Sequence, residues 1–152
     1  MPDRTRDRIR DTKMQAMNAA HRCVLRLSGR RLGARLANMA VCTVTTTGRT
    51  SGQPRTVFLT APIQHDDTYV FVASKGGDDR HPDWYQNMVA HPAFLLEPAD
   101  GRGPLTLVAR TATDDERAEL WPRIVAAHQG YGSYQAKTDR TIPVVIAQPA
   151  PG

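Results

Sequence analysis

Three apolar stretches separated by turns rich in glycine, hydroxyl and charged groups occupy residues 39–74. The first stretch (MAVCTVTTT) is rich in β-branched side chains and predicts a strand. Pro54 stands at the entry to the second, where its missing N–H does least harm to a strand. In chain order, the predicted elements are strand 39–47, turn 48–54, strand 55–61, turn 65–67 and strand 68–74. Strands that return on one another in this way favour antiparallel pairing.

Further short strands alternate with predicted helices in the rest of the chain. Pro82 suits the first position of a helix, and His91, which precedes a proline, ends it. Thr113 and Glu116 have the spacing of a capping box, which opens a second helix that ends near Gly130. The remaining elements are strand 93–97, turn 100–103, strand 105–110, a loop or short helix at 131–137 and strand 142–147. Helices placed between hairpinned strands, without strict βαβ alternation, indicate an antiparallel barrel with flanking helices, a mainly β or α+β fold.

The positive charge of the chain is concentrated near its beginning. Residues 1–40 hold ten Arg or Lys and three Asp, a balance of +7, whereas the whole chain carries +5. The apolar positions Met14, Met17, Ala20, Val24 and Leu27 follow helical spacing, and residues 32–39 are expected to add a turn or two. Such a basic amphipathic helix either packs on the barrel or touches an anionic membrane. Nucleic-acid binding is disfavoured because no aromatic side chain lies among the basic ones.

The length of 152 residues fits one folded domain, so we expect a basic arm and helix at 1–38 and a barrel domain at 39–148. No apolar run approaches the ~20 residues of a membrane span, and the first residues lack the apolar core of a secretory signal. Cys23 and Cys42 are the two cysteines, and we expect both to be reduced and buried. These features predict a cytoplasmic protein.

Several chemical motifs are excluded by the residues around each glycine, histidine and serine. The segment GRTSGQPR lacks the Gly-Lys-Ser/Thr of a Walker loop and leads into a strand, and no GxGxxG comes after a strand. The five histidines have no metal-ligand spacing, so no metal site is expected. There is no GxSxG nucleophile motif.

What remains is a basic rim rich in hydroxyl groups on two predicted turns, formed by Arg49, Thr50, Ser51, Arg55, Ser74, Lys75 and Arg80. Gly76 and Gly77 allow backbone N–H groups to approach an anion closely. The rim therefore suggests a site for an elongated anionic ligand, although two ordinary turns with solvated charges explain the same residues. Trp84 and the pair Tyr131 and Tyr134 are either core aromatics or ligand platforms.

Five strings in chain order (TTTGRTSGQPR, VASKGG, HPDWYQNM, ATDDERAELWP and YGSYQAKTDRTIPVVI) together resemble the deazaflavin-dependent nitroreductase family of actinobacteria. The likeness covers residues 40–148. It implies a split antiparallel β-barrel of the flavin-reductase type. It also implies an oxidoreductase that transfers a hydride from reduced coenzyme F420 to a quinone or nitro compound.

The resemblance also implies roles for individual residues. Ser74, Tyr131 and Tyr134 would act in catalysis, at the acceptor side of the pocket. The cofactor would contact Arg49, Thr50, Ser51, Gln53, Arg55, Ala73, Ser74, Lys75, Gly76, Gly77 and Trp84. The sequence departs from the family at Thr50, where a lysine is frequent, and at Thr60 and His128, where relatives carry aromatic residues.

Alternatives to this function are a carrier or sensor that binds a deazaflavin or flavin without turnover, and an FMN-dependent oxidase of the same barrel class. FMN is the less expected cofactor, because it lacks the long anionic tail of F420. The expected partners are a small quinone or nitro acceptor and no nucleic acid. The chain is expected to be a monomer or homodimer in the cytoplasm, with peripheral contact at the inner face of the plasma membrane through its first helix.

Overall fold

The β-branched stretch at the start of the barrel domain forms the nine-residue strand β2 (Met39–Thr47), which pairs antiparallel with β3 (Pro54–Ala61). The register places Ala40 opposite Ala61 and Thr47 opposite Pro54, so the hairpin is paired along its whole length. In this computed structural model, residues 35–36 and 39–151 are described. The predicted arm and helix at 1–38, apart from residues 35–36, and Cys23 lie outside them.

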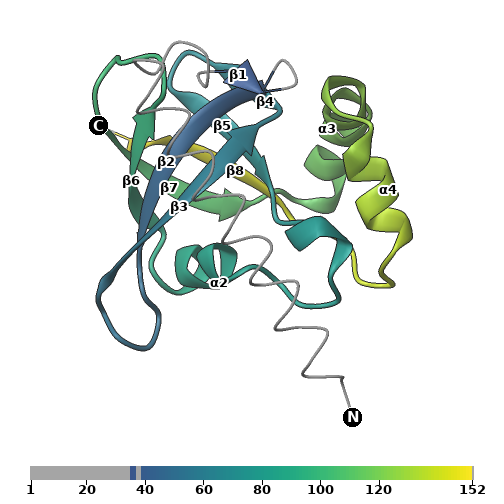
Figure 1. Cartoon of the computed structure of the whole chain (residues 1–152), viewed down its shortest axis with the longest axis horizontal. Helices are drawn as coiled ribbons and strands as arrows, with labels where there is room; N and C mark the ends of the chain where they lie inside the picture. Colours follow the sequence, from purple (N-terminus) through teal and green to yellow (C-terminus); the bar gives the residue numbers. More distant parts are fainter. Residues whose placement is uncertain (1–34, 37–38, 152) are drawn as a thin grey trace.

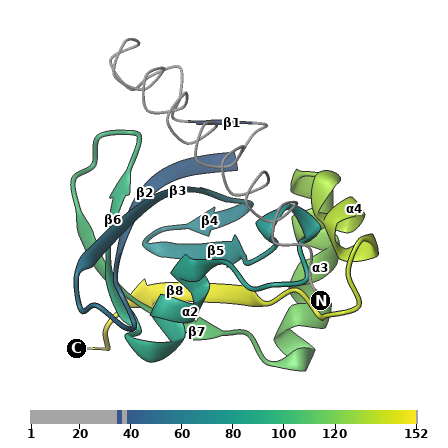
Figure 2. The ribbon, with the colours of Figure 1, turned by 60° about the horizontal axis from the view of Figure 1, so that its bottom comes forward.

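In the described part of the chain, eight strands form one antiparallel sheet, in the order β1-β2-β6-β7-β8-β5-β4, with β3 pairing on β2. The remaining strands are β1 (Arg35–Leu36), β4 (Ile63–His65), β5 (Thr68–Val72), β6 (Ala93–Pro98), β7 (Leu105–Thr111) and β8 (Val144–Pro149). The sheet curls into a half-barrel, as Figure 2 shows for β2, β3, β5 and β8. The predicted antiparallel split barrel with flanking helices is therefore confirmed.

Within residues 39–151, three α-helices lie around this sheet: α2 (Asp83–Ala90), α3 (Asp114–Ala127) and α4 (Gly130–Ala136). The capping box that predicted α3 is present, because the Thr113 side chain accepts from the Glu116 N–H and the Glu116 carboxylate accepts from the Thr113 N–H. α3 and α4 lie together beyond one end of the sheet, while α2 lies near the β2–β3 hairpin (Figure 1). A short 3-10 turn, η1 (Lys75–Gly77), comes after β5.

Both faces of β5 are buried, which explains its uninterrupted apolar sequence. Tyr69 and Phe71 point into a core cluster inside the half-barrel, together with Cys42, Val44, Leu96 and Leu107. Val70 and Val72 point into a second cluster with Ile124, Tyr131 and Ile142, beneath α3 and α4. Cys42 is fully buried, as predicted, and burial raises the pKa of its thiol to about 12.

Four local predictions were wrong in their bounds or type. Residues 32–39 were expected to be helical, but Arg35 and Leu36 pair with β2 as strand β1, and Met39 begins β2. β4 was missed, because its three residues are too few to show a period. β5 ends at Val72, two residues before its predicted end, and β8 spans Val144–Pro149 where 142–147 was expected.

Candidate functional site

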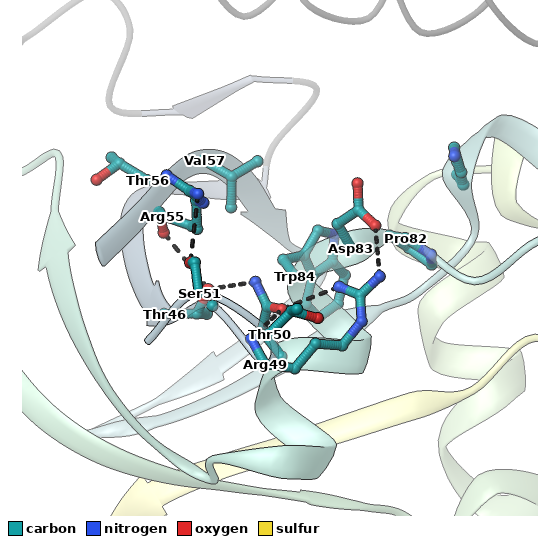
Figure 3. Close-up of a pocket in the computed structure, with 13 residues that line it drawn as sticks. Thr46, Arg49, Thr50, Ser51, Arg55, Thr56, Val57, Pro82, Asp83 and Trp84 are labelled. Carbon is teal, nitrogen blue, oxygen red and sulfur yellow. Dashed lines mark hydrogen bonds and ion pairs between the residues drawn. The ribbon is translucent and has the colours of Figure 1, made fainter. Parts of the chain in front are cut away.

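A cleft of about 490 Å³ lies where the β2–β3 hairpin meets η1 and the beginning of α2. Its walls come from three parts of the chain that the fold brings together (Figure 3). The lining residues are Thr46, Gly48, Arg49, Thr50, Ser51, Arg55, Thr56, Val57, Lys75, Pro82, Asp83, Trp84 and Asn87. Two predicted loops and the predicted aromatic residue therefore border one cavity.

The hairpin turn at 48–53 owes its shape to two backbone hydrogen bonds and one hydroxyl. The Gly48 N–H donates to the Gln53 carbonyl at 2.8 Å, and the Gly52 N–H donates to the Gly48 carbonyl at 2.9 Å. Ser51 Oγ accepts from the Gln53 N–H at 3.2 Å and from Arg55 Nη2 at 3.3 Å. Gly52 has a φ of +69°, which glycine adopts without strain. The turn therefore presents Arg49, Thr50 and Ser51 to the cleft in a fixed arrangement.

Asn87 joins this turn to α2. Its side chain is 3% exposed. The Asn87 Oδ1 accepts from the Arg49 N–H at 3.1 Å and from Arg49 Nη1 at 3.0 Å, while Nδ2 donates to Thr46 Oγ1 at 3.1 Å. Arg49 Nη2 also donates to Asp83 Oδ1 at 3.1 Å. The Arg49 guanidinium is thus held at the wall of the cleft by two side chains of one helix. Figure 3 shows its contact with Asp83.

The sequence analysis missed Thr46, Asp83 and Asn87 as members of the site. Asp83 and Asn87 are four residues apart, so they lie on the same side of α2. A polar pair at that spacing at the start of an aromatic helix was the available signal. This pair could have indicated that the helix binds a basic turn. The spacing alone does not predict which turn the helix contacts.

The second loop, 73–78, has an unusual backbone. Lys75, Gly76 and Gly77 have φ values of +46°, +65° and +85°. A Cβ built on Gly77 would lie 2.8 Å from the Tyr134 carbonyl oxygen, so α4 packs directly on this turn. Lys75 lines the cleft.

Four residues of loop 73–78 that were predicted to bind the cofactor do not line the cleft: Ala73, Ser74, Gly76 and Gly77. Ala73 is fully buried and Ser74 is 8% exposed. Gln53, which was also predicted, lies in the hairpin turn but outside the cleft lining. The loop therefore brings one predicted side chain, Lys75, to the cavity.

Arg80 was predicted to belong to the basic rim but does not line the cleft. Its Nε and Nη2 donate to the two carboxylate oxygens of Asp78, each at 3.1 Å. Asp78 is 3% exposed, and burial alone would raise the pKa of its carboxyl. Hydrogen bonds from Arg80 and its positive charge outweigh that effect and lower the pKa to about 2. Arg80 therefore stabilises a buried carboxylate.

Tyr131 and Tyr134 of α4 lie outside the cleft lining. Tyr131 is 6% exposed, and its hydroxyl lies 3.1 Å from Thr60 Oγ1 and 3.6 Å from Met39 Sδ. Burial raises the pKa of this hydroxyl. The Tyr134 ring makes an edge contact with Tyr131, with centroids 6.0 Å apart. The structure thus places Tyr131 and the half-buried Tyr134 against the second core cluster, on the side of Thr60 and His128.

Among the described residues that line the cleft, three are cations and one is a carboxylate. Arg49, Arg55 and Lys75 are positive, and Asp83 is negative. Hydroxyls of Thr46, Thr50, Ser51 and Thr56 add hydrogen-bonding groups, and Trp84 adds an aromatic surface. The arrangement can hold an anion beside a flat ring. The described residues contain no group of three or more His, Cys, Asp or Glu placed to hold a metal ion.

Comparison with known proteins identifies relatives over most of the chain. A family model for the F420H(2)-dependent quinone reductase matches residues 17–149. The F420H(2)-dependent quinone reductase Rv1261c of Mycobacterium tuberculosis H37Rv is 41% identical over 103 residues, which cover 66% of this chain and 68% of that protein.

Two solved structures are also similar. One is an F420-H2 dependent reductase (FDR-A), with a TM-score of 0.63 and 40% identity, covering 71% of this chain and 93% of that one. The other is a domain-swapped dimer, with a TM-score of 0.65 and 33% identity, covering 95% of this chain and 99% of that one.

Proposed function

Because the chain belongs to the F420H(2)-dependent quinone reductase family, we propose that the cleft between the hairpin turn, Lys75 and α2 is where it binds coenzyme F420. The protein is an enzyme that uses F420 to reduce quinones. When bound, reduced F420 supplies the hydride that the acceptor receives. The relatives are reductases, and they give no support to a carrier, a sensor or an FMN-dependent oxidase.

The observation that carries the proposed site is the set of three cations from two loops around one cavity. Arg49 and Arg55 come from the hairpin, and Lys75 comes from the loop after β5. F420 continues from its phosphodiester into a chain of carboxylates, whereas FMN ends in a single phosphate. Cations spread along a cleft suit the longer anion, because each can meet a different negative group. An ion pair between a cation of the cleft and an anionic group of the ligand is stronger where it is shielded from water and weaker where it is exposed.

Trp84 supplies the flat surface of the proposed site. Its ring makes edge contacts with Phe71 and Tyr85, at centroid distances of 6.2 and 6.3 Å. Phe71 is 1% exposed and belongs to the barrel core, so it fixes one side of the indole. We propose that the exposed part of the Trp84 ring borders the deazaflavin rings. An aromatic wall of this kind restricts the orientation of a planar cofactor.

We propose that the side of the pocket that receives the acceptor is formed by Ser74, Tyr131 and Tyr134. Ser74 adjoins Lys75, and the tyrosines lie on α4, which packs on Gly77. A tyrosine hydroxyl is protonated at neutral pH and can donate to an oxygen on which negative charge develops. Tyr134 suits this role better than Tyr131, whose hydroxyl is already engaged by Thr60. Reduction of nitro compounds stays a prediction beside quinone reduction.

A homodimer is also proposed, since a similar chain forms a domain-swapped dimer. A cytoplasmic location with contact at the inner membrane face is a further proposal, based on the basic residues 1–40. No helix within the described residues has the length and apolar character that crossing a membrane requires. Equal sedimentation of the chain with neutral and anionic vesicles would rule against the membrane contact.

Titration of F420 and FMN against the wild type and Lys75→Ala tests the cofactor site. We expect the wild type to bind F420 more tightly than FMN, and the variant to bind F420 roughly tenfold more weakly, because it loses one charge-assisted contact. Arg123→Ala is the control: it removes one positive charge from an exposed side chain of α3, outside the cleft. Tighter binding of FMN, or equal loss in both variants, would contradict the proposed site.

A further inference from the structure

The loop that carries Lys75 is tied to a distant part of the chain by Arg140, which lies between α4 and β8. Arg140 Nη2 donates to the carbonyls of Ala73 and Ser74, at 3.1 and 3.0 Å. Its Nε donates to the Asp78 carbonyl at 2.8 Å. One guanidinium therefore holds the loop on both sides of the Lys75–Gly77 turn.

The fourth partner of this guanidinium is a histidine that follows the same loop. Arg140 Nη1 lies 3.1 Å from His81 Nδ1. Arginine has donors only, so His81 Nδ1 accepts and the ring is neutral with its proton on Nε2. Burial and the charge of Arg140 lower the pKa of His81, which agrees with this geometry. The His81 ring also contacts Tyr85, with centroids 5.0 Å apart.

The backbone of Arg140 is held by the side chains of Gln135 and Thr138. Gln135 Nε2 donates to the Arg140 carbonyl at 2.8 Å, and the Arg140 N–H donates to Thr138 Oγ1 at 3.3 Å. The Thr138 hydroxyl donates to Asp79 Oδ1 at 2.8 Å, a second link between the two segments. The guanidinium therefore projects from a segment whose position is set by α4.

The loop needs such support because its backbone is strained. Lys75 has a φ of +46°, a left-handed conformation that costs free energy for a residue with a side chain. Strained residues keep their conformation only when the surrounding structure holds them. Arg140 binds the carbonyls immediately before and after the three left-handed residues, where it opposes relaxation of the turn most directly.

We propose that Arg140 is a positioning residue for the cofactor cleft, which acts by holding loop 73–78 so that Lys75 faces the anionic part of the ligand. The inference rests on the proposed cofactor site. Arg140 does not line the cleft and needs no contact with F420. Its effect passes through three loop carbonyls, so it concerns first the position of Lys75 and the binding of F420.

The test compares Arg140→Met, Arg140→Lys and the control Arg102→Met with the wild type. Methionine keeps much of the side-chain length but removes every donor, and lysine keeps the charge without the planar fork. Arg102 bonds the Tyr69 hydroxyl at 2.7 Å and the Asp100 carboxylate, and neither belongs to the loop. Each protein is measured for F420 affinity by fluorescence, for steady-state kinetics with a quinone and for the pKa of His81 by NMR.

We expect Arg140→Met to weaken F420 binding and raise the KM for reduced F420 about tenfold, with a smaller change in kcat and in the quinone KM. Arg140→Lys should fall between this variant and the wild type. The pKa of His81 should rise in Arg140→Met, because the neighbouring charge and the donor to Nδ1 are gone. Arg102→Met should leave the F420 affinity and the His81 pKa unchanged.

The outcomes separate this inference from the function it rests on. Wild-type F420 affinity in Arg140→Met, or an unchanged His81 pKa, overturns the positioning role while the cofactor site stands. A wild type that does not bind F420 overturns the cofactor site, and the NMR measurement still tests the link between Arg140 and the loop. If Arg140→Met does not fold, the same comparison is made with Arg140→Lys, where wild-type binding overturns the inference.

Discussion

At the scale of single residues, the most connected side chain of the cleft is a buried amide. The Asn87 oxygen accepts two hydrogen bonds from Arg49, and the nitrogen donates to Thr46. An amide side chain accepts through its oxygen and donates through its nitrogen without carrying a charge. Asn87 therefore joins the hairpin to α2 and orients a cation of the proposed cofactor site.

Asn87→Ala should lower the free energy of unfolding by roughly 1–3 kcal/mol, because it leaves the buried Thr46 hydroxyl and the part-buried donors of Arg49 without this partner. It should also weaken F420 binding, since Arg49 loses a fixed direction. Denaturant unfolding and F420 titration measure the two effects. Val89→Ala, at a site on the same helix that is 62% exposed, is the control. A stability like that of the control would contradict the bridging role of Asn87.

The sequence was informative about individual residues where their role is local. Arg49, Ser51 and Lys75 were predicted from turn composition, and they reach one cleft. Arg80 was predicted on the same grounds but pairs with Asp78, because a buried carboxylate two residues away competes for it. Composition counts the cations of a turn, but it does not show which of them the fold places at the cleft.

At the scale of elements, the strongest local signals were the most reliable. The β-branched stretch of β2 and the capping box of α3 predicted those elements correctly. The short strands β1 and β4 gave no periodic signal and depend on their pairing partners. The contact between α4 and η1 also could not be predicted, since it depends on tertiary packing between distant segments.

The contact between α4 and η1 predicts different costs for two glycine substitutions. Gly77 and Gly101 have nearly equal φ values, +85° and +83°. A Cβ at Gly77 would meet the Tyr134 carbonyl oxygen at 2.8 Å, whereas a Cβ at Gly101 would meet nothing within 4 Å. Both alanine variants should lose about 1–2 kcal/mol of stability to the left-handed backbone. Gly77→Ala should lose more, because α4 must shift.

Thermal and denaturant unfolding of Gly77→Ala and Gly101→Ala provide the comparison. Because the backbone cost is shared, the difference between the variants reports the packing of α4 on the turn. F420 titration should show weaker binding for Gly77→Ala alone, since the turn carries Lys75. Equal free energies of unfolding for the two variants would mean that α4 shifts away from the turn without loss of stability.

At the scale of the whole molecule, the cleft exists because distant strands pair. β2 pairs with β6 and β5 with β8, so the order in the sheet departs from the order in the chain. This pairing sets the hairpin turn and the loop after β5 beside α2. Local sequence patterns do not predict which strands pair when they are far apart in the chain. The fold class was predicted from the resemblance to a family as well as from the spacing of the hairpins. The residues that line the cleft could therefore be identified only from the structure.

The buried Asp78 makes a prediction for the stability of the whole molecule in acid. Its pKa is lowered from 3.8 to about 2 in the folded protein. The unfolded chain therefore takes up a proton at this carboxyl at a higher pH than the folded one. The stability that Asp78 contributes is present above about pH 4 and is lost as the pH falls towards 2. The difference amounts to about 2 kcal/mol.

Asp78→Asn removes this titration but keeps a polar side chain of the same shape. The free energy of unfolding, measured with urea from pH 5 to 2, should therefore fall less steeply for the variant than for the wild type. Glu116, whose pKa is lowered to about 2 by hydrogen bonds from Arg110 and Thr113, contributes equally to both proteins and cancels. Asp67→Asn, at an exposed turn position, is the control and should follow the wild-type curve. Parallel curves for Asp78→Asn and the wild type would show that Arg80 does not favour the ionised form of this carboxyl.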